Sequence, residues 1–128
     1  MTKKTILVID DQPEILETFE EIINIQFDLK IDTAQNAVKA LEMVEKKHYG
    51  LICCDVIMPG MNGVQFIDFL RSGSSQNKDC PIIVLSGNVE DVIEDLKEFK
   101  DVTAINKVDE ITILFDSIES LLGEDTED

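Results

Sequence analysis

The sequence is poor in side chains that bind transition metals or serve histidine-dependent catalysis. It has one histidine, His48, and three cysteines, Cys53, Cys54 and Cys80, with no CxxC spacing. The sequence therefore provides few of the histidine and cysteine side chains that a zinc site or a His-dependent triad requires. Because successive strand residues point to opposite faces, we interpret Cys53 and Cys54 as small core side chains and not as a redox pair.

Basic charge is scarce as well. Lysine and arginine number 11 against 27 aspartate and glutamate residues, which gives a formal net charge of -16. Phosphate backbones and anionic membrane surfaces should repel such a chain, so direct binding of nucleic acid is not expected.

A long apolar run is also missing. Spanning a membrane takes about 18 or more consecutive apolar residues, and neither such a run nor a signal-like segment after Met1 is present. We therefore expect a cytoplasmic protein that does not enter a membrane. At 128 residues the chain fits one domain, and we interpret the polar stretch 72–79 as a surface loop and not as a linker.

What the sequence does contain is a regular alternation of two patterns. Short apolar runs occupy residues 5–9, 29–34, 50–55, 81–86 and 102–106. The first, third and fourth are nearly continuous, as in parallel strands that are buried on both faces.

Segments with helical spacing follow these runs. The first begins near Pro13, and the other four cover residues 34–47, 64–71, 89–99 and 111–122. Five strands that alternate with five helices predict an α/β fold with a doubly wound parallel sheet and right-handed crossovers.

Polar side chains collect where the predicted strands end. The first strand ends in Asp10 and Asp11, the third in Asp55, the fourth in Ser86 and the fifth in Lys107. In an open parallel sheet, ligands bind beyond the carboxyl ends of the strands, where the winding reverses. These side chains should therefore meet at one edge.

Three carboxylates at one edge repel one another by about 4 kcal/mol per pair at 4 Å and an effective dielectric constant of 20. A cation offsets this repulsion, and an all-oxygen site with few carboxylates favours Mg²⁺. Ser86 and Lys107 would then face a phosphoryl group. The other interpretation is an ion-paired cluster that only ties the sheet together.

The segment DVIMPGMNG, residues 55–63, gives one of these acids a special position. Pro59, Gly60 and Gly63 force turns, so the next helix should begin near Gly63 and leave the side chain of Asp55 accessible at the strand end. A metal-bound aspartate there can attack phosphorus and form an aspartyl phosphate. A plain strand-to-helix turn would explain the same proline and glycines.

Taken together, ILVIDDQPEI, ICCDVIMPGMNG, IIVLSG and INK resemble the receiver domain of two-component response regulators, along essentially the whole chain. The resemblance to this CheY-like superfamily implies a flavodoxin-like strand order 2-1-3-4-5. It also implies a receiver domain over residues 1–122, followed by an acidic tail at 123–128.

The resemblance further implies a Mg²⁺ site and its ligands. Asp11 matches the direct ligand and Asp10 its water-mediated companion. Asp55 and the backbone carbonyl of Ile57 match the remaining protein ligands.

For the reaction, the resemblance implies that Asp55 is the phosphoacceptor, with Ser86 and Lys107 bound to the phosphoryl group. The donor would be a histidine kinase or a phosphotransfer protein. Such a domain catalyses only its own phosphorylation and dephosphorylation, so it is not expected to be an enzyme on a separate substrate. Its effect would pass through contacts with an unknown downstream protein.

Two positions near the end of the last strand depart from the family pattern. Val108 follows Lys107 where the family usually has a proline in a cis peptide, and a cis bond before a non-proline costs about 3 kcal/mol. We therefore expect a trans bond and a shifted loop. Ala104 stands where the family usually has Tyr, Phe or His, so the relay of hydroxyl and aromatic side chains should work only in part.

Ile57 and Asn88 would flank the phosphoryl site, two residues after Asp55 and Ser86. We hypothesise that apolar Ile57 orients the attacking water poorly and makes the phosphoryl group long-lived, compared with an Ile57→Asn variant.

Three other functions are open to the sequence. Residues 106–109, NKVD, match the guanine-recognition box of GTPases, but no GxxxxGK[ST] loop accompanies them. Phosphatases of the haloacid-dehalogenase type need a second acid where this chain has Ile57. A receiver-like interaction module without phosphorylation-dependent output is the third possibility, which Ala104 and Val108 favour and the complete set of acids opposes.

Overall fold

The computed structural model describes residues 5–26, 29–56, 58, 60–87, 90 and 92–106. Its centre is a five-stranded parallel sheet in the order β2-β1-β3-β4-β5. The strands are β1 (Thr5–Ile9), β2 (Lys30–Ala34), β3 (Leu51–Asp55), β4 (Ile82–Ser86) and β5 (Val102–Asn106). The predicted doubly wound sheet and its strand order 2-1-3-4-5 are therefore confirmed.

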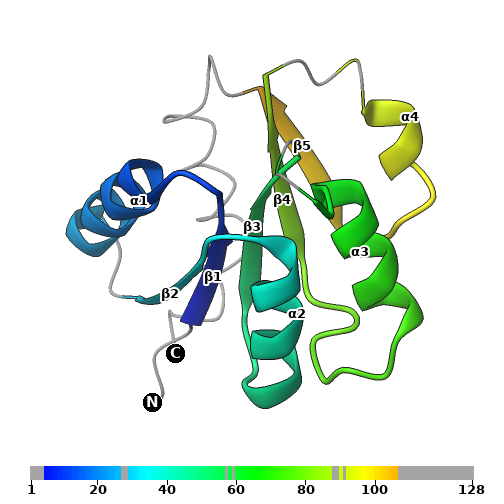
Figure 1. Cartoon of the computed structure of the whole chain (residues 1–128), viewed down its shortest axis with the longest axis horizontal. Helices are drawn as coiled ribbons and strands as arrows, with labels where there is room; N and C mark the ends of the chain where they lie inside the picture. The colour runs from blue at the N-terminus through cyan, green and yellow to red at the C-terminus, as the bar shows by residue number, and fades with distance from the viewer. Residues whose placement is uncertain are drawn as a thin grey trace.

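Helices cover both faces of this sheet. The described ones are α1 (Pro13–Gln26), α2 (Ala37–Lys46), α3 (Gly63–Ser72) and α4 (Ile93–Leu96). Figure 1 shows α1 on one face and α2, α3 and α4 on the other. The helix predicted at 111–122 lies outside the described residues. Of the helices in the described ranges, none is long and apolar enough to cross a bilayer.

Helix α4 is shorter than the pattern over residues 89–99 predicts. It spans four residues, and its first turn follows Val92, which provides no side-chain cap. Residues 97–101 turn back toward β5. An isolated helix this short has little stability of its own, because nucleation is unfavourable and few hydrogen bonds follow it.

The core consists of two apolar layers, one on each face of the sheet. Strands β1, β3 and β4 are buried at every residue, as expected for nearly continuous apolar runs. Leu7 and Ile9 pack in the layer under α2 and α3, whereas Ile6 and Val8 pack in the layer under α1. The period of two along a strand separates the two layers.

The adjacent cysteines follow the same alternation. Cys54 lies in the first layer and Cys53 in the second, and both are free thiols with no exposed surface. Burial raises the pKa of Cys53 to about 12, so its thiol stays neutral. Their interpretation as small core side chains is confirmed.

The segment 72–79, predicted as a surface loop, is more buried than its polar composition indicates. Ser75 and Asn77 are buried, with 8% and 1% of their surface exposed. The amide nitrogen of Asn77 donates to the carbonyl oxygens of Val44 (2.8 Å) and Lys47 (2.6 Å), and its side-chain oxygen accepts the backbone N–H of Tyr49 (2.7 Å). These bonds satisfy backbone groups around the end of α2, where the hydroxyl of Ser75 also donates to the carbonyl oxygen of Val44.

Arg71 stabilises the same end of the molecule through hydrogen bonds to two loops. Its guanidinium donates to the carbonyl oxygens of Lys78 (2.7 Å) and Lys100 (2.8 Å). The end of α3 is thereby joined to the loops before β4 and before β5.

We predict that Asn77→Ala destabilises the protein by about 2–4 kcal/mol, because it removes the side-chain partner of the Tyr49 N–H and of the Lys47 carbonyl oxygen and one of the two donors to the Val44 carbonyl oxygen. Chemical denaturation measures this loss. Gln76→Ala, at the exposed neighbouring position, is the control and should change the free energy of unfolding by less than about 0.5 kcal/mol. Equal effects at the two positions would refute the anchoring role of Asn77.

Candidate functional site

Strand register brings two acids to the same level of the sheet. Strands β1 and β3 are neighbours, and Ile9 is paired with Cys54. The next residues along the two strands are Asp10 and Asp55, which therefore lie side by side at the carboxyl edge. Asp11 follows directly.

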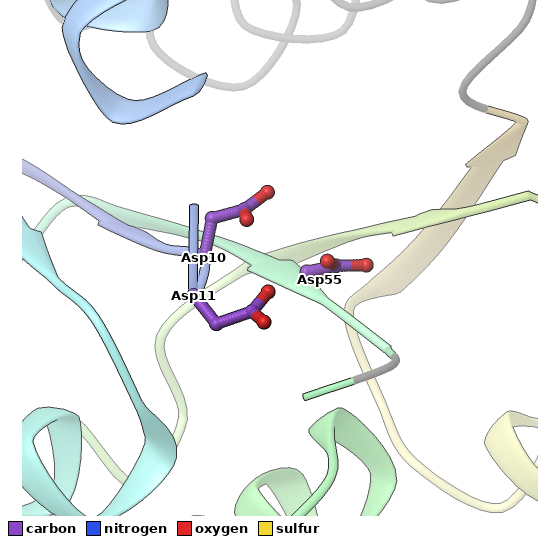
Figure 2. A group of neighbouring side chains, drawn as sticks. All are labelled: Asp10, Asp11 and Asp55. Atoms are coloured by element: carbon purple, nitrogen blue, oxygen red, sulfur yellow. The ribbon is translucent and has the colours of Figure 1, made fainter. Parts of the chain in front are cut away.

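The three carboxylates meet in space. One carboxylate oxygen each of Asp10, Asp11 and Asp55 can be chosen so that all lie within 4.8 Å of one another. Figure 2 shows Asp10 and Asp11 reaching from the end of β1, beside Asp55 at the end of β3. The predicted meeting of these three acids is thus present.

Asp10 and Asp55 are enclosed, whereas Asp11 is the most exposed of the three. The carboxylate of Asp10 accepts the backbone N–H of Gln12 at 3.0 Å, and the carbonyl of Gln12 accepts the first N–H groups of α1. The first acid is therefore fixed by the start of the helix that follows it.

The prediction that the side chain of Asp55 is accessible was wrong. Asp55 ends β3 as predicted, but only 5% of the residue is exposed. The carboxylates of Asp10 and Asp11, which follow β1, lie close to its side chain, and Gly63 approaches its backbone.

The loop between β3 and α3 is held close to Asp55. The N–H of Gly63 donates to the carbonyl oxygen of Val56 at 2.9 Å. A Cβ atom at Gly63 would lie 2.6 Å from the carbonyl oxygen of Asp55, so only glycine fits there. Helix α3 begins at Gly63, as predicted, and Asn62 caps it in a reciprocal pair with Gln65.

Ser86 lies at the same edge, one strand further along. Asp55 is paired with Leu85 on β4, so Ser86 stands one residue beyond the level of Asp55 and is 4% exposed. Ala104 lies in β5, paired with Val84, and packs against the apolar layer under α2 and α3. The predicted site residues Ile57 and Lys107 lie outside the described residues, as do Asn88 and Val108.

The electrostatics of this edge suit a hard cation. Carboxylates within 4.8 Å of one another repel by about 3–4 kcal/mol per pair at an effective dielectric constant of 20. The donors are all oxygen atoms, and the more exposed Asp11 leaves one side open. Mg²⁺ is commonly held by one or two carboxylates with several waters and a phosphate oxygen, so the residues fit this ion.

A hollow of about 400 Å³, which the sequence does not predict, lies beside Asp11. Its other walls belong to the start of α2 and to the loop before α3: Gln35, Asn36, Ala37, Val38, Gly60 and Met61. These two segments are far apart in the sequence, and only the sheet order brings them together. The turn that the glycine predicted in this loop is present, since Gly60 has a positive φ of 79°.

The family model described as the response regulator receiver domain matches residues 6–118. The nitrate/nitrite response regulator protein NarL of Escherichia coli is 34% identical over 98 residues, which are 76% of this chain and 45% of NarL. The chain therefore spans less than half the length of this relative.

Two solved structures are similar to this chain in three dimensions. The chemotaxis protein CheY4 of Vibrio cholerae has a TM-score of 0.84 at 23% identity, covering 94% of this chain and 100% of that one, and shows the fold alone. The response regulator TrrA of Thermotoga maritima, in complex with Mg²⁺ and BeF, has a TM-score of 0.77 at 28% identity, covering 93% of this chain and 99% of that one.

We predict that Gly63→Ala destabilises the protein by about 1–3 kcal/mol, because its Cβ would collide with the backbone of Asp55 and Val56. Thermal or chemical denaturation measures the change. Gly87→Ala is the matched control: among the described residues, no atom outside its chain neighbours lies within 4 Å of the added Cβ. If both variants are as stable as the wild type, the close approach at Gly63 is not a constraint.

We also predict that Mg²⁺ raises the melting temperature, since an ion at 100 times its dissociation constant stabilises the folded state by about 2.7 kcal/mol. Asp11→Asn should remove most of this gain without lowering stability in EDTA, because it takes away one of three like charges. Glu45→Gln, on the exposed surface of α2, is the control for net charge. The same Mg²⁺ response in Asp11→Asn as in the wild type would show that the ion binds elsewhere.

Proposed function

The chain belongs to the response regulator receiver family, and from this premise we propose that Mg²⁺-dependent transfer of a phosphoryl group to Asp55 switches its contacts with other proteins. The observation that carries the proposal is the meeting of Asp10, Asp11 and Asp55, from two neighbouring strands, within 4.8 Å. A receiver domain of two-component signalling has its acidic pocket at this edge of the sheet, and receiver domains bind Mg²⁺ there.

Asp55 is the nucleophile in this proposal. One of its carboxylate oxygens attacks the phosphorus of a phosphohistidine, the P–O bond forms, and the P–N bond breaks with its electron pair returning to the donor nitrogen. Only 5% of Asp55 is exposed, so its surroundings contain little bulk water. The aspartyl phosphate is later hydrolysed, which returns the carboxylate and releases phosphate.

Asp10 and Asp11 would hold the metal together with Asp55 and the carbonyl of Ile57. When bound, Mg²⁺ neutralises charge on the acids and on the phosphoryl oxygens. Asp10 is suited to a fixed, indirect role because it is buried and its carboxylate already accepts the N–H of Gln12. Asp11 is suited to direct contact because it is the more exposed.

Ser86 and Lys107 would bind the phosphoryl oxygens. The position of Ser86 at the end of β4, one strand from Asp55, supports its role as a hydroxyl donor. For Lys107 the support is its position in the sequence, directly after β5, and the family resemblance. An ammonium group there would balance charge on the phosphoryl group.

The phosphoryl donor would be a histidine kinase or a phosphotransfer protein, and the setting the cytoplasm. We infer that the receiver domain covers residues 1–122 and is followed by an acidic tail at 123–128, which the family match over 6–118 supports. The chain would act on no separate substrate. Its effect would pass to a downstream protein through surface contacts.

We predict that acetyl phosphate with Mg²⁺ adds one phosphoryl group to the wild-type chain and none to Asp55→Asn, as measured by intact mass. EDTA should abolish the addition. Asp68→Asn, at an exposed position of α3, is the control and should react as the wild type does. An unchanged mass in the wild type, with beryllofluoride also without effect, would favour a receiver-like interaction module over a phosphorylation switch. Repeated turnover of an added phosphomonoester would favour a phosphatase.

A further inference from the structure

A second surface of the molecule is hollowed, and its lining includes none of Asp10, Asp11, Asp55 and Ser86. A groove of about 580 Å³ runs between α3 and the segment that contains α4. These two elements lie next to each other on the face of the sheet opposite α1 (Figure 1). The volume is within the range of about 300–1,000 Å³ that is usual for binding pockets.

The lining of the groove combines apolar and acidic side chains. Val64 and Phe99 are partly buried and pack against the apolar layer under α2 and α3, so they provide apolar surface within the groove. The acidic side chains along it are Asp68, Glu94, Asp95 and Glu98. A ligand would therefore meet apolar surface and carboxylates together.

The charge of the groove is not balanced by its own cation. Lys97 is the cation among the described lining residues, and it pairs with Glu94 at 2.6 Å. Asp68, Asp95 and Glu98 carry no cationic partner in the described ion pairs. The net charge of the described lining is negative, so the groove attracts cations and repels anions.

We propose that this groove binds a segment of a partner protein that presents both apolar and basic side chains, most simply one face of an amphipathic helix. The apolar side chains would cover Val64 and Phe99, and arginine or lysine would face the carboxylates. A second copy of this chain fits poorly, because each copy carries a net charge of -16. Nucleic acid and anionic membranes fit poorly for the same reason.

Both walls of the groove are held in place. One wall, α3, has a reciprocal cap at Asn62 and is joined to two loops by Arg71. The other contains α4, a helix of four residues that Val92 and Leu96 anchor in the apolar layer under α2 and α3. The groove is therefore formed before a partner binds.

The experiment uses the full chain without Mg²⁺ or a phosphoryl donor, so its result does not depend on phosphorylation of Asp55. The probe is a fluorescein-labelled peptide of about 16 residues, long enough to form a helix, with leucine and arginine on one face and alanine and glutamine elsewhere. Fluorescence anisotropy measures its affinity, and backbone amide shifts in NMR spectra locate it. We expect saturable binding, with the largest shifts in residues 64–68 and 94–99.

Two triple variants with the same net charge separate this groove from general acidity. The groove variant carries Asp68→Asn, Asp95→Asn and Glu98→Gln; the control variant carries Glu17→Gln, Glu20→Gln and Glu21→Gln on the exposed surface of α1. We expect the groove variant to bind the peptide about five- to tenfold more weakly than the wild type, and the control variant to lose less than about twofold.

Several outcomes would overturn the proposal. Equal losses in the two variants would mean that the peptide responds only to net charge. Unchanged affinity after glutamine replaces the leucines would mean that the apolar surface takes no part. Shifts centred on another surface, or no binding at millimolar peptide, would mean that the groove is not a docking site. NMR spectra of both variants also show whether each is folded.

Discussion

Repulsion between three carboxylates is the constraint on which the organisation of this protein depends. Asp10 and Asp55 are brought level by the pairing of β1 with β3, and Asp11 follows in the chain. A flexible backbone would relieve such repulsion by letting the acids move apart. Here the acids lie at the ends of strands that are buried along their whole length, so the sheet resists that movement and keeps the three carboxylates together.

The two ends of the strands are stabilised by different contacts. At the acidic site, the N–H of Gln12 fixes Asp10, and the close approach of Gly63 fixes the backbone of Asp55. At the opposite end of the strands, Asn77 and Arg71 join helix ends to loops, Asn77 through buried or partly buried hydrogen bonds and Arg71 through exposed ones. The acidic site and the hydrogen bonds of Asn77 and Arg71 thus lie at opposite ends of the strands. Substitutions at the two ends should be nearly independent, because distant sites usually add.

Much of the fold and part of the site could be predicted from the sequence, because both depend on strong local patterns. The nearly continuous apolar runs identify buried parallel strands, and acids directly after two of these runs must meet once β1 and β3 are neighbours. What could not be predicted depends on tertiary contacts. The burial of Asp55 and that of Asn77, whose side chain bonds to the end of α2, arise only when segments distant in the sequence come together; neither leaves a local sequence signal. The short α4 shows an amphipathic pattern overridden by turns.

The anchored loop before β4 has a practical consequence for protein engineering. Its composition, SGSSQNKD, is that of a linker, and such a stretch is where a reporter or an affinity tag would ordinarily be inserted. Asn77, however, occupies a fixed place from which it reaches Val44, Lys47 and Tyr49, and Ser75 also donates to the carbonyl of Val44. An insertion between Ser75 and Asn77 would disrupt this arrangement. Gly73 and Ser74, which are exposed and precede the anchor, are the better point at which to open the chain.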